Sequence, residues 1–410
     1  MSLDRPADRG PVQALYAIAR PLADLLPGLV ALRRDLHAHP ELAYQERRTA
    51  GIVAQSLRLL GLEVHEGIGG TGVVGTLRLG SGTGTRSVGL RADMDALPMV
   101  ELGRAPHASR NAGAHHGCGH DGHTSMLVGA ARQLARAGGL PAGLDGTVHF
   151  IFQPAEEGQG GARRMIEDGL FERFPCDSVY ALHNWPDLPL GTARTRPGPI
   201  MAAADRFDLT VRGRGGHAAQ PHHTPDAILA ASHLVAQLHT IVSRRIDPGE
   251  SAVLSVTRIE GGQSHNVLPA EVRITGTVRS FDAEAQDRIE AALRAVCEGV
   301  AIASGTAVEV TYVRYYPATV NAPAQAALAL EAAAAIGLRA ESAPRAAFTS
   351  EDFAFMLREK PGAYLWLGQG RADPGPEGER PLHHPCYDFN DDALPLGVRW
   401  FCEVARRALG

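Results

Sequence analysis

The sequence predicts an α/β protein whose open, mostly parallel sheet domain carries an inserted ferredoxin-like domain. In the outer parts of the 410-residue chain, short apolar runs alternate with helical patterns, which is typical of a sheet with helical connections. The middle of the chain instead follows the order β-α-β-β-α-β, the order of a ferredoxin-like domain. We therefore expect a discontinuous domain, residues 1–202 and 317–410, interrupted by a compact domain at residues 203–316.

Four runs rich in β-branched or aromatic residues predict the strands of the outer domain. They are Ser87–Asp95, Gly146–Gln153, Ser178–Trp185 and Ala363–Gly370. Each is almost continuously apolar, which favours strands that are buried on both faces of a parallel sheet. Helical patterns lie between them, at His123–Ala137 and Gly161–Leu170.

The predicted insert contains four strands and two helices. Arg206–Arg212 alternates apolar and polar residues as a strand does, and Thr224–Arg245 repeats apolar residues along one side as an amphipathic helix does. The remaining elements follow as strands Ser251–Glu260 and Glu271–Phe281, helix Asp282–Ala303 and strand Ala307–Tyr316.

The composition is that of an ordinary soluble globular protein, with 44% hydrophobic and 21% charged residues. A net charge of −5 gives no reason to expect nucleic acid or an anionic membrane as a partner. No apolar run reaches the roughly 18 residues that a membrane span needs, and Met1–Gly10 is not followed by an apolar stretch of signal-peptide type. The five cysteines are scattered and odd in number, which disfavours a disulfide framework and predicts a cytoplasmic protein.

The strongest chemical signal lies between a predicted strand and a predicted helix. Residues Ala114–His123 contain one thiol, four imidazoles and a carboxylate. Thiolate and imidazole are the preferred ligands of zinc, and Cys118 and His120 stand two residues apart between glycines. The alternative is a polar loop whose histidines cap a helix at His123, but the density of ligand types favours a metal site.

Two adjacent glutamates, Glu156 and Glu157, follow the second predicted strand directly. At the end of a strand they can point to different sides, so that one binds a metal while its neighbour faces a substrate. A solvated turn is the alternative reading of such a pair. Ligands gather at the carboxyl ends of strands in open α/β sheets, however, and Asp93, Asp95 and His183 occupy the same kind of position.

Five residues together offer sulfur, nitrogen and oxygen donors that could hold two divalent ions. They are Cys118, His120, Glu157, His183 and His383. Taken alone, His183 or His383 would more often be a structural histidine than a ligand. The sequence has no Gly-x-Ser-x-Gly nucleophile motif and no Walker-type phosphate loop to favour another chemistry.

On these residues the chain resembles the aminoacylase/carboxypeptidase family of dinuclear metallohydrolases, and within it the hippurate hydrolase and indole-acetyl-amino-acid hydrolase branch. The motifs that carry the resemblance run over nearly the whole chain. In order they are RDLH (34–37), HPE (39–41), LRADMDALP (90–98), HGCGHDGH (116–123), QPAEEG (153–158), ALH (181–183), GRGGHAA (213–219), NVLP (266–269), GTVR (276–279), SEDF (350–353) and HHPCYDF (383–389).

The resemblance implies an enzyme that hydrolyses the amide bond of N-acyl-L-amino acids, such as hippurate-like or N-acetyl substrates. It implies a metal-activated water, with Glu156 as the general base and two divalent ions per subunit on the five residues above. Zinc suits these ligands best, and manganese, cobalt and nickel stay open. The alternative function is a dipeptidase or carboxypeptidase that uses the same dinuclear site.

The resemblance also implies roles for residues outside the metal set. The insert would serve as a lid and as the contact of a homodimer or higher homo-oligomer. Its His217 would reach the scissile carbonyl oxygen across the dimer, while Arg279 and Asn266 would contact the substrate. Asp95 would support a metal ligand from behind.

Two positions depart from the family pattern. Gly117 stands where alanine is expected, which would loosen a turn. His384 stands beside His383, so the identity of the last metal-binding histidine stays open, with His383 favoured by its place in the motif.

Overall fold

The structure of the protein is a computed structural model that describes residues 19–80, 84–136, 144–371, 373 and 380–410. The expectation for Met1–Gly10 lies outside these residues. The chain divides into two compact units, the first comprising 1–200, 320–345 and 355–410, and the second comprising 201–319 and 346–354. None of the described helices combines the length and apolar character that crossing a membrane requires.

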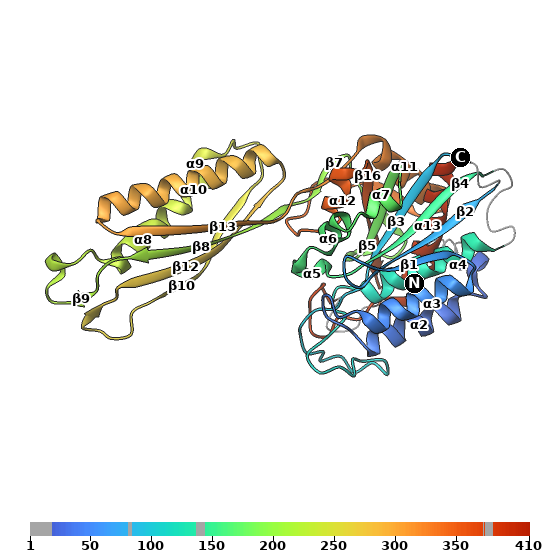
Figure 1. Cartoon of the computed structure of the whole chain (residues 1–410), viewed down its shortest axis with the longest axis horizontal. Helices are drawn as coiled ribbons and strands as arrows, with labels where there is room; N and C mark the ends of the chain where they lie inside the picture. The colour runs from blue at the N-terminus through green and yellow to red at the C-terminus, as the bar shows by residue number, and fades with distance from the viewer. Residues whose placement is uncertain (1–18, 81–83, 137–143, 372, 374–379) are drawn as a thin grey trace, which may run out of the picture. The chain divides into compact units, whose positions relative to one another are not determined.

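Eight strands of the described chain form the central sheet of the first unit (Figure 1). In spatial order they are β1 (Glu63–Ile68), β2 (Gly72–Leu79), β4 (Gly146–Gln153), β3 (Ser87–Asp93), β5 (Ser178–Pro189), β16 (Gly362–Gly370), β6 (Thr192–Thr195) and β15 (Arg339–Ser342). The four central strands, which are those predicted from the sequence, run parallel. Nearly every residue of β3, β4 and β16 is buried, as expected for strands covered on both faces. The open, mostly parallel α/β sheet is thereby confirmed.

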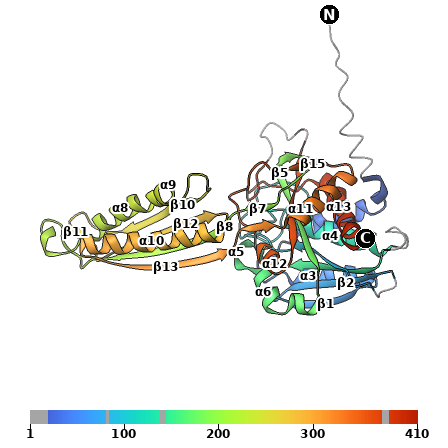
Figure 2. The same ribbon diagram turned by 90° about the horizontal axis from the view of Figure 1, so that it is seen from above.

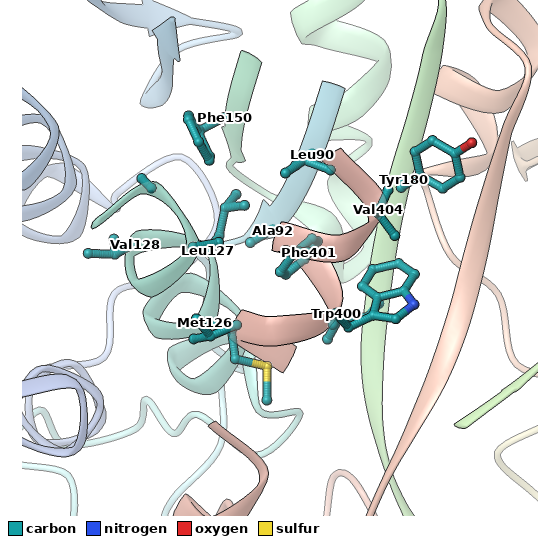
Figure 3. Close-up of a cluster of buried hydrophobic side chains, with 14 of the residues drawn as sticks. Leu90, Ala92, Met126, Leu127, Val128, Phe150, Tyr180, Trp400, Phe401 and Val404 are labelled. Carbon is teal, nitrogen blue, oxygen red and sulfur yellow. The ribbon is translucent and has the colours of Figure 1, made fainter. Parts of the chain in front are cut away.

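The helices of the first unit connect and cover this sheet. They are α2 (Leu26–Ala38), α3 (Arg47–Leu59), α4 (His120–Ala135), α5 (Glu156–Gln159), α6 (Gly161–Glu167), α7 (Leu170–Arg173), α11 (Pro323–Ala335), α12 (Ala354–Glu359) and α13 (Leu394–Leu409). Figure 3 shows part of the core, where Leu90 of β3, Leu127 of α4 and Phe401 of α13 are buried side by side. Burying each such side chain contributes about 1.5–3 kcal/mol. This packing holds α4, and therefore its first residue His120, against the sheet.

The second unit is the predicted ferredoxin-like domain (Figure 2). Its main elements are β8 (Ala203–Arg212), α8 (Ala227–Leu238), α9 (Thr240–Arg245), β10 (Val253–Gly261), β12 (Glu271–Ser280), α10 (Ala283–Ser304) and β13 (Ala307–Tyr316). The antiparallel sheet has the order β10-β12-β8-β13. Burial alternates along β12, because one face packs on a core with the helices and the other stays open.

Two short strand pairings were not predicted, and one predicted helix begins later than expected. β9 (Gly216–His217) pairs with β11 (Val267–Leu268), and β7 (Gly198–Met201) pairs with β14 (Thr319–Asn321). These strands are too short for a period-two pattern to identify them. The helix expected over Thr224–Arg245 begins later, at Ala227, because the Asp226 carboxylate caps the backbone nitrogens of Ile228 and Leu229.

Candidate metal centre

The chemically active side chains of the first unit lie where its parallel strands end. β3 ends at Asp93 and β4 ends at Gln153, whereas His183 lies near the middle of β5, which continues to Pro189, and not at the strand end that the sequence predicts. Because these strands are parallel neighbours, their carboxyl ends meet at one edge of the sheet.

Cys118 and His120 reach this edge on the turn that opens α4. The helix begins at His120 itself, so the alternative in which histidines cap a helix at His123 is wrong. Gly119 adopts φ 97°, and a Cβ atom at this position would lie 2.3 Å from the Asn184 side-chain oxygen. Only glycine therefore fits between the two candidate ligands.

The rings of His120 and His183 are oriented in the same way by the backbone. Nδ1 of His120 donates to the Asp95 carbonyl oxygen at 2.9 Å, and Nδ1 of His183 donates to the Asn184 carbonyl oxygen at 2.7 Å. Each Nε2 lone pair is therefore free to face the centre, as is usual for metal-binding histidines. Nε2 of His120 makes no hydrogen bond with the described residues, and Nε2 of His183 lies 3.4 Å from the Cys118 sulfur.

Glu156 and Glu157 lie in the turn after β4, and both face the same centre. One carboxylate oxygen of each lies within 4.8 Å of the other and of a ring nitrogen of His120. The expectation that strand geometry sends them to different sides is therefore wrong. The strand has already ended at Gln153, and Ala155 takes a left-handed conformation, with φ 53°, that turns the chain.

Cys118 belongs to two groups of three candidate ligands whose ligand atoms lie close together. Cys118, His120 and His183 each offer one ligand atom within a 4.8 Å span, and so do Cys118, Glu157 and His383. Nε2 of His383 lies 3.4 Å from Oε1 of Glu157. The neighbouring His384 has a different environment, because its Nδ1 accepts a hydrogen bond from the Cys386 backbone nitrogen at 3.0 Å.

The donor atoms of this centre fit divalent cations. Oε1 of Glu157 and Nε2 of His120 are buried and lack hydrogen-bond partners among the described residues. Burial and the charges of Glu157 and Glu156 raise the pKa of the Cys118 thiol well above its ordinary value. A nearby cation would remove this penalty and stabilise the thiolate, which is the ligand form of cysteine.

Asp95 supports the centre from behind with both its backbone and its side chain. Its carbonyl oxygen accepts from His120, and its Oδ2 accepts from the Glu157 backbone nitrogen at 3.0 Å. It therefore contacts two candidate ligands at once.

Several buried partners of the centre were not predicted from the sequence. Nδ1 of His123 donates to Oδ1 of Asp93 at 2.6 Å and Nε2 lies 2.5 Å from Oδ1 of Asn184, so both ring nitrogens are engaged. The Asn184 amide in turn donates to the Tyr387 hydroxyl at 2.7 Å. Glu46 of the first unit accepts a hydrogen bond from the Ala155 nitrogen. The position of Asn184 directly after the predicted ligand His183 could have indicated it, whereas no local pattern indicates Glu46.

The remaining predicted site residues belong to the second unit. His217 and Asn266 are exposed and lie on neighbouring segments, because the Asn266 carbonyl oxygen accepts from the Ala218 nitrogen at 3.0 Å. The Ala219 nitrogen donates to Nδ1 of His217 at 3.1 Å, which leaves the proton of a neutral ring on Nε2. Arg279 lies on the open face of β12, half-buried.

Comparison with known proteins gives a consistent result along the whole chain. The family described as Peptidase family M20/M25/M40 matches residues 89–407. An N-acetylcysteine deacetylase from Bacillus subtilis is 38% identical over 92% of this chain and 96% of its own length. A hippurate hydrolase from Campylobacter jejuni is 37% identical over 95% and 98%, respectively. The crystal structure of a dinuclear metal-binding peptidase of the M20 family from Bacillus subtilis superimposes with a TM-score of 0.81 and 34% identity, covering 94% of this chain and 99% of the other.

Proposed function

The chain belongs to the M20/M25/M40 peptidase family of enzymes acting on amides, and we propose that it hydrolyses the amide bond of N-acyl-L-amino acids. The observation that carries this proposal is the convergence of sulfur, imidazole and carboxylate ligands beside a further carboxylate, that of Glu156. A purely structural metal site is closed and needs no additional acid. The similarity to a hippurate hydrolase and to an N-acetylcysteine deacetylase favours aromatic acyl or acetyl groups on the substrate.

We assign the metal ligands to Cys118, His120, Glu157, His183 and His383. Cys118 belongs to two of the convergent groups, which suits a thiolate shared by two ions. When bound, the ions would polarise the amide carbonyl and acidify a water molecule. The mixture of thiolate, imidazole and carboxylate ligands is best suited to zinc, with manganese, cobalt or nickel as alternatives.

Glu156 is the general base in this proposal. Its carboxylate lies within 4.8 Å of the candidate ligands His120 and Glu157 and is buried, so it can take a proton from the attacking water. The same carboxyl group then delivers that proton to the leaving amine. Two hydrogen bonds hold the turn that carries Glu156. Glu46 accepts from the backbone nitrogen of Ala155, and Asp95 accepts from the backbone nitrogen of Glu157.

The second unit would supply the contacts to the substrate. Nε2–H of His217 can donate to the oxyanion that develops on the scissile carbonyl, a contribution worth about 3–4 kcal/mol in a dry site. The guanidinium group of Arg279 suits the substrate carboxylate, and the Asn266 amide suits the oxyanion side.

In this proposal the contacts come from two copies of the chain. Arg279 pairs with Ala204 near the start of β8, whereas Gly216–His217 follows the end of β8 at Arg212. Eight residues of extended chain separate the two positions by about 25 Å, and β9 lies at one end of this unit in Figure 1. One copy therefore cannot place both His217 and Arg279 on one small substrate, which supports a homodimer that shares its sites.

We also propose a cytoplasmic location. All five cysteines are free thiols, and three of them, Cys118, Cys176 and Cys297, are buried. A chain without disulfides needs no oxidising compartment.

The test combines metal analysis with a substrate panel. The full chain, reconstituted with zinc or manganese, is assayed against hippurate, N-acetyl-amino acids and dipeptides, with the chelated protein as the control. We expect turnover of the acyl-amino acids that chelation abolishes. Preferential cleavage of the dipeptides would instead favour the dipeptidase or carboxypeptidase function, and failure on all three classes in a metal-replete preparation would refute the proposal.

A further inference from the structure

A second group of ligand-type side chains lies in the first unit, separate from the five proposed ligands. It consists of His37 on α2 and of Glu101 and His115, both on the segment between β3 and α4. One ligand atom from each of the three lies within 4.8 Å of the others. Both imidazoles are fully buried, and the Glu101 side chain is 4% exposed.

His115, like its buried neighbour His116, is an imidazole that needs an explanation. Neither of its ring nitrogens makes a hydrogen bond with any described residue, although the ring is completely buried. Buried polar atoms are nearly always partnered, so an orphaned imidazole indicates a missing group. Gly117 makes room for this ring, since a Cβ atom at position 117 would lie only 3.0 Å from Cδ2 of His115.

The distances in the group match a coordination polyhedron better than a set of hydrogen bonds. Nε2 of His37 makes a long hydrogen-bond contact of 3.4 Å with Oε1 of Glu101, and Nδ1 of His115 lies 3.4 Å from Oε2 of the same carboxylate. Hydrogen bonds between nitrogen and oxygen are usually about 2.9 Å long. Two ligand atoms at about 2.05 Å from a tetrahedral zinc ion stand about 3.3 Å apart.

The surroundings orient one ring for metal binding. Nδ1 of His37 donates to Oδ2 of Asp121 at 2.8 Å, which leaves the Nε2 lone pair facing Glu101 and His115. A carboxylate behind a histidine in this way is the usual support of a zinc ligand. The Glu101 side chain is also held in place, because its Oε2 accepts a hydrogen bond from the Ser109 backbone nitrogen at 2.6 Å.

We propose that His37, Glu101 and His115 bind a third divalent cation, for which zinc is the best match. Two imidazoles and one carboxylate form a known zinc ligand set with a fourth position left for water. The ion would tie α2 to the segment that leads, three residues after His115, to Cys118. By joining these two segments, the ion would hold the approach to the dinuclear centre in place.

The charge of the region is compatible with a cation. Burial and the nearby Arg33 guanidinium oppose protonation, yet the charge and hydrogen bond of Asp121, together with the hydrogen bond of Glu101, raise the pKa of His37 to about 9. The carboxylates that favour a proton at this place also favour a metal ion. A protonated His37 between Asp121 and Glu101 is the competing explanation, but it leaves Nε2 of His115 without a hydrogen bond to any described residue and Nδ1 with only its 3.4 Å contact to Glu101.

The first experiment counts bound zinc. The wild-type chain and the variants His115→Leu and Glu101→Gln are stripped, reloaded with zinc, desalted and analysed by inductively coupled plasma mass spectrometry. We expect each variant to hold one equivalent less than wild type per chain. The control variant His149→Gln, which removes a buried histidine elsewhere in the same unit, should keep the wild-type value. The difference between the variants and wild type does not depend on how many ions the dinuclear centre holds.

Two outcomes would overturn the proposal. One is an unchanged zinc content in His115→Leu and Glu101→Gln, which would leave the protonated His37 as the explanation. The other is a loss of two or more equivalents, which would make His115 a support of the dinuclear centre. If the variants do not fold, zinc-edge anomalous diffraction from zinc-soaked wild-type crystals decides, since the proposal requires a peak between His37, Glu101 and His115 and fails without one.

Discussion

Oε1 of Glu46 accepts a hydrogen bond from the backbone nitrogen of Ala155 at 2.9 Å, across 109 positions of the chain. Both residues are fully buried, and the second oxygen of Glu46 accepts from the Thr71 hydroxyl. Ala155 has a left-handed backbone and immediately precedes Glu156. The contact therefore fixes the turn that presents the proposed general base.

Replacing Glu46 should separate its hydrogen-bonding role from its charge. Glu46→Ala leaves the buried Ala155 nitrogen without an acceptor, so we expect the free energy of unfolding to fall by about 1–3 kcal/mol and turnover to fall with it. Glu46→Gln keeps an oxygen acceptor and should retain most of both. Chemical denaturation and steady-state kinetics measure the two effects, with the exposed Glu172→Ala as control. Equal losses in the alanine and glutamine variants would contradict this explanation.

Replacing the proposed base, Glu156, should lower turnover without changing the metal content. Glu156→Gln keeps the shape of the side chain but cannot accept a proton, so we expect kcat to fall by about 10²–10⁴-fold. The metal content should not change, and neither quantity should change in the exposed Glu167→Gln. Near wild-type turnover in Glu156→Gln would assign the base to another residue.

Replacing a proposed metal ligand should lower the metal content as well as the activity. Cys118→Ala and Glu157→Ala each remove a donor atom, so the purified variants should hold at least one metal equivalent less than wild type and lose activity together with the metal. Elemental analysis measures the metal content, and Cys176→Ala, which removes a different buried thiol, serves as control. A variant that keeps the full metal content would remove that residue from the ligand set.

Mixing two inactive variants tests whether subunits share a site. His217→Ala and Glu156→Gln chains are each inactive in the proposed mechanism, but a hybrid dimer contains one site with both residues intact. Random exchange in equal amounts should restore about a quarter of the wild-type activity. His239→Ala, which changes an exposed histidine of the same unit, should be active without mixing. No recovery in verified hybrids would contradict a shared site.

Acid should destabilise the fold through His149. Burial lowers the pKa of this histidine from 6.5 to about 4. The unfolded chain therefore binds more protons between these values, and stability falls as the pH drops from 6.5 to 4. The effect is on the order of 3 kcal/mol. His149→Gln should flatten the unfolding free energy over this range, whereas His65→Gln, at a half-exposed site, should not.

The strands and the types of ligand could be predicted from local sequence, because both are local properties. Continuous apolar runs identify strands buried on two faces, and the four central strands follow from them. Side-chain chemistry identified Cys118 and His120 as candidate ligands, and the order of strands and helices identified the insert.

Only the tertiary structure determined which side chains come into contact. Parallel pairing of β3, β4 and β5 brings segments far apart in the chain to one edge, and the left-handed turn at Ala155 points both glutamates inward. The roles of Glu46 and His115 depend on contacts that the sequence pattern does not show: Glu46 accepts from the Ala155 nitrogen, and His115 lies against the Glu101 carboxylate. The physical reason is that sequence patterns record burial and local backbone preference, whereas a binding centre depends on distances between atoms that only packing determines.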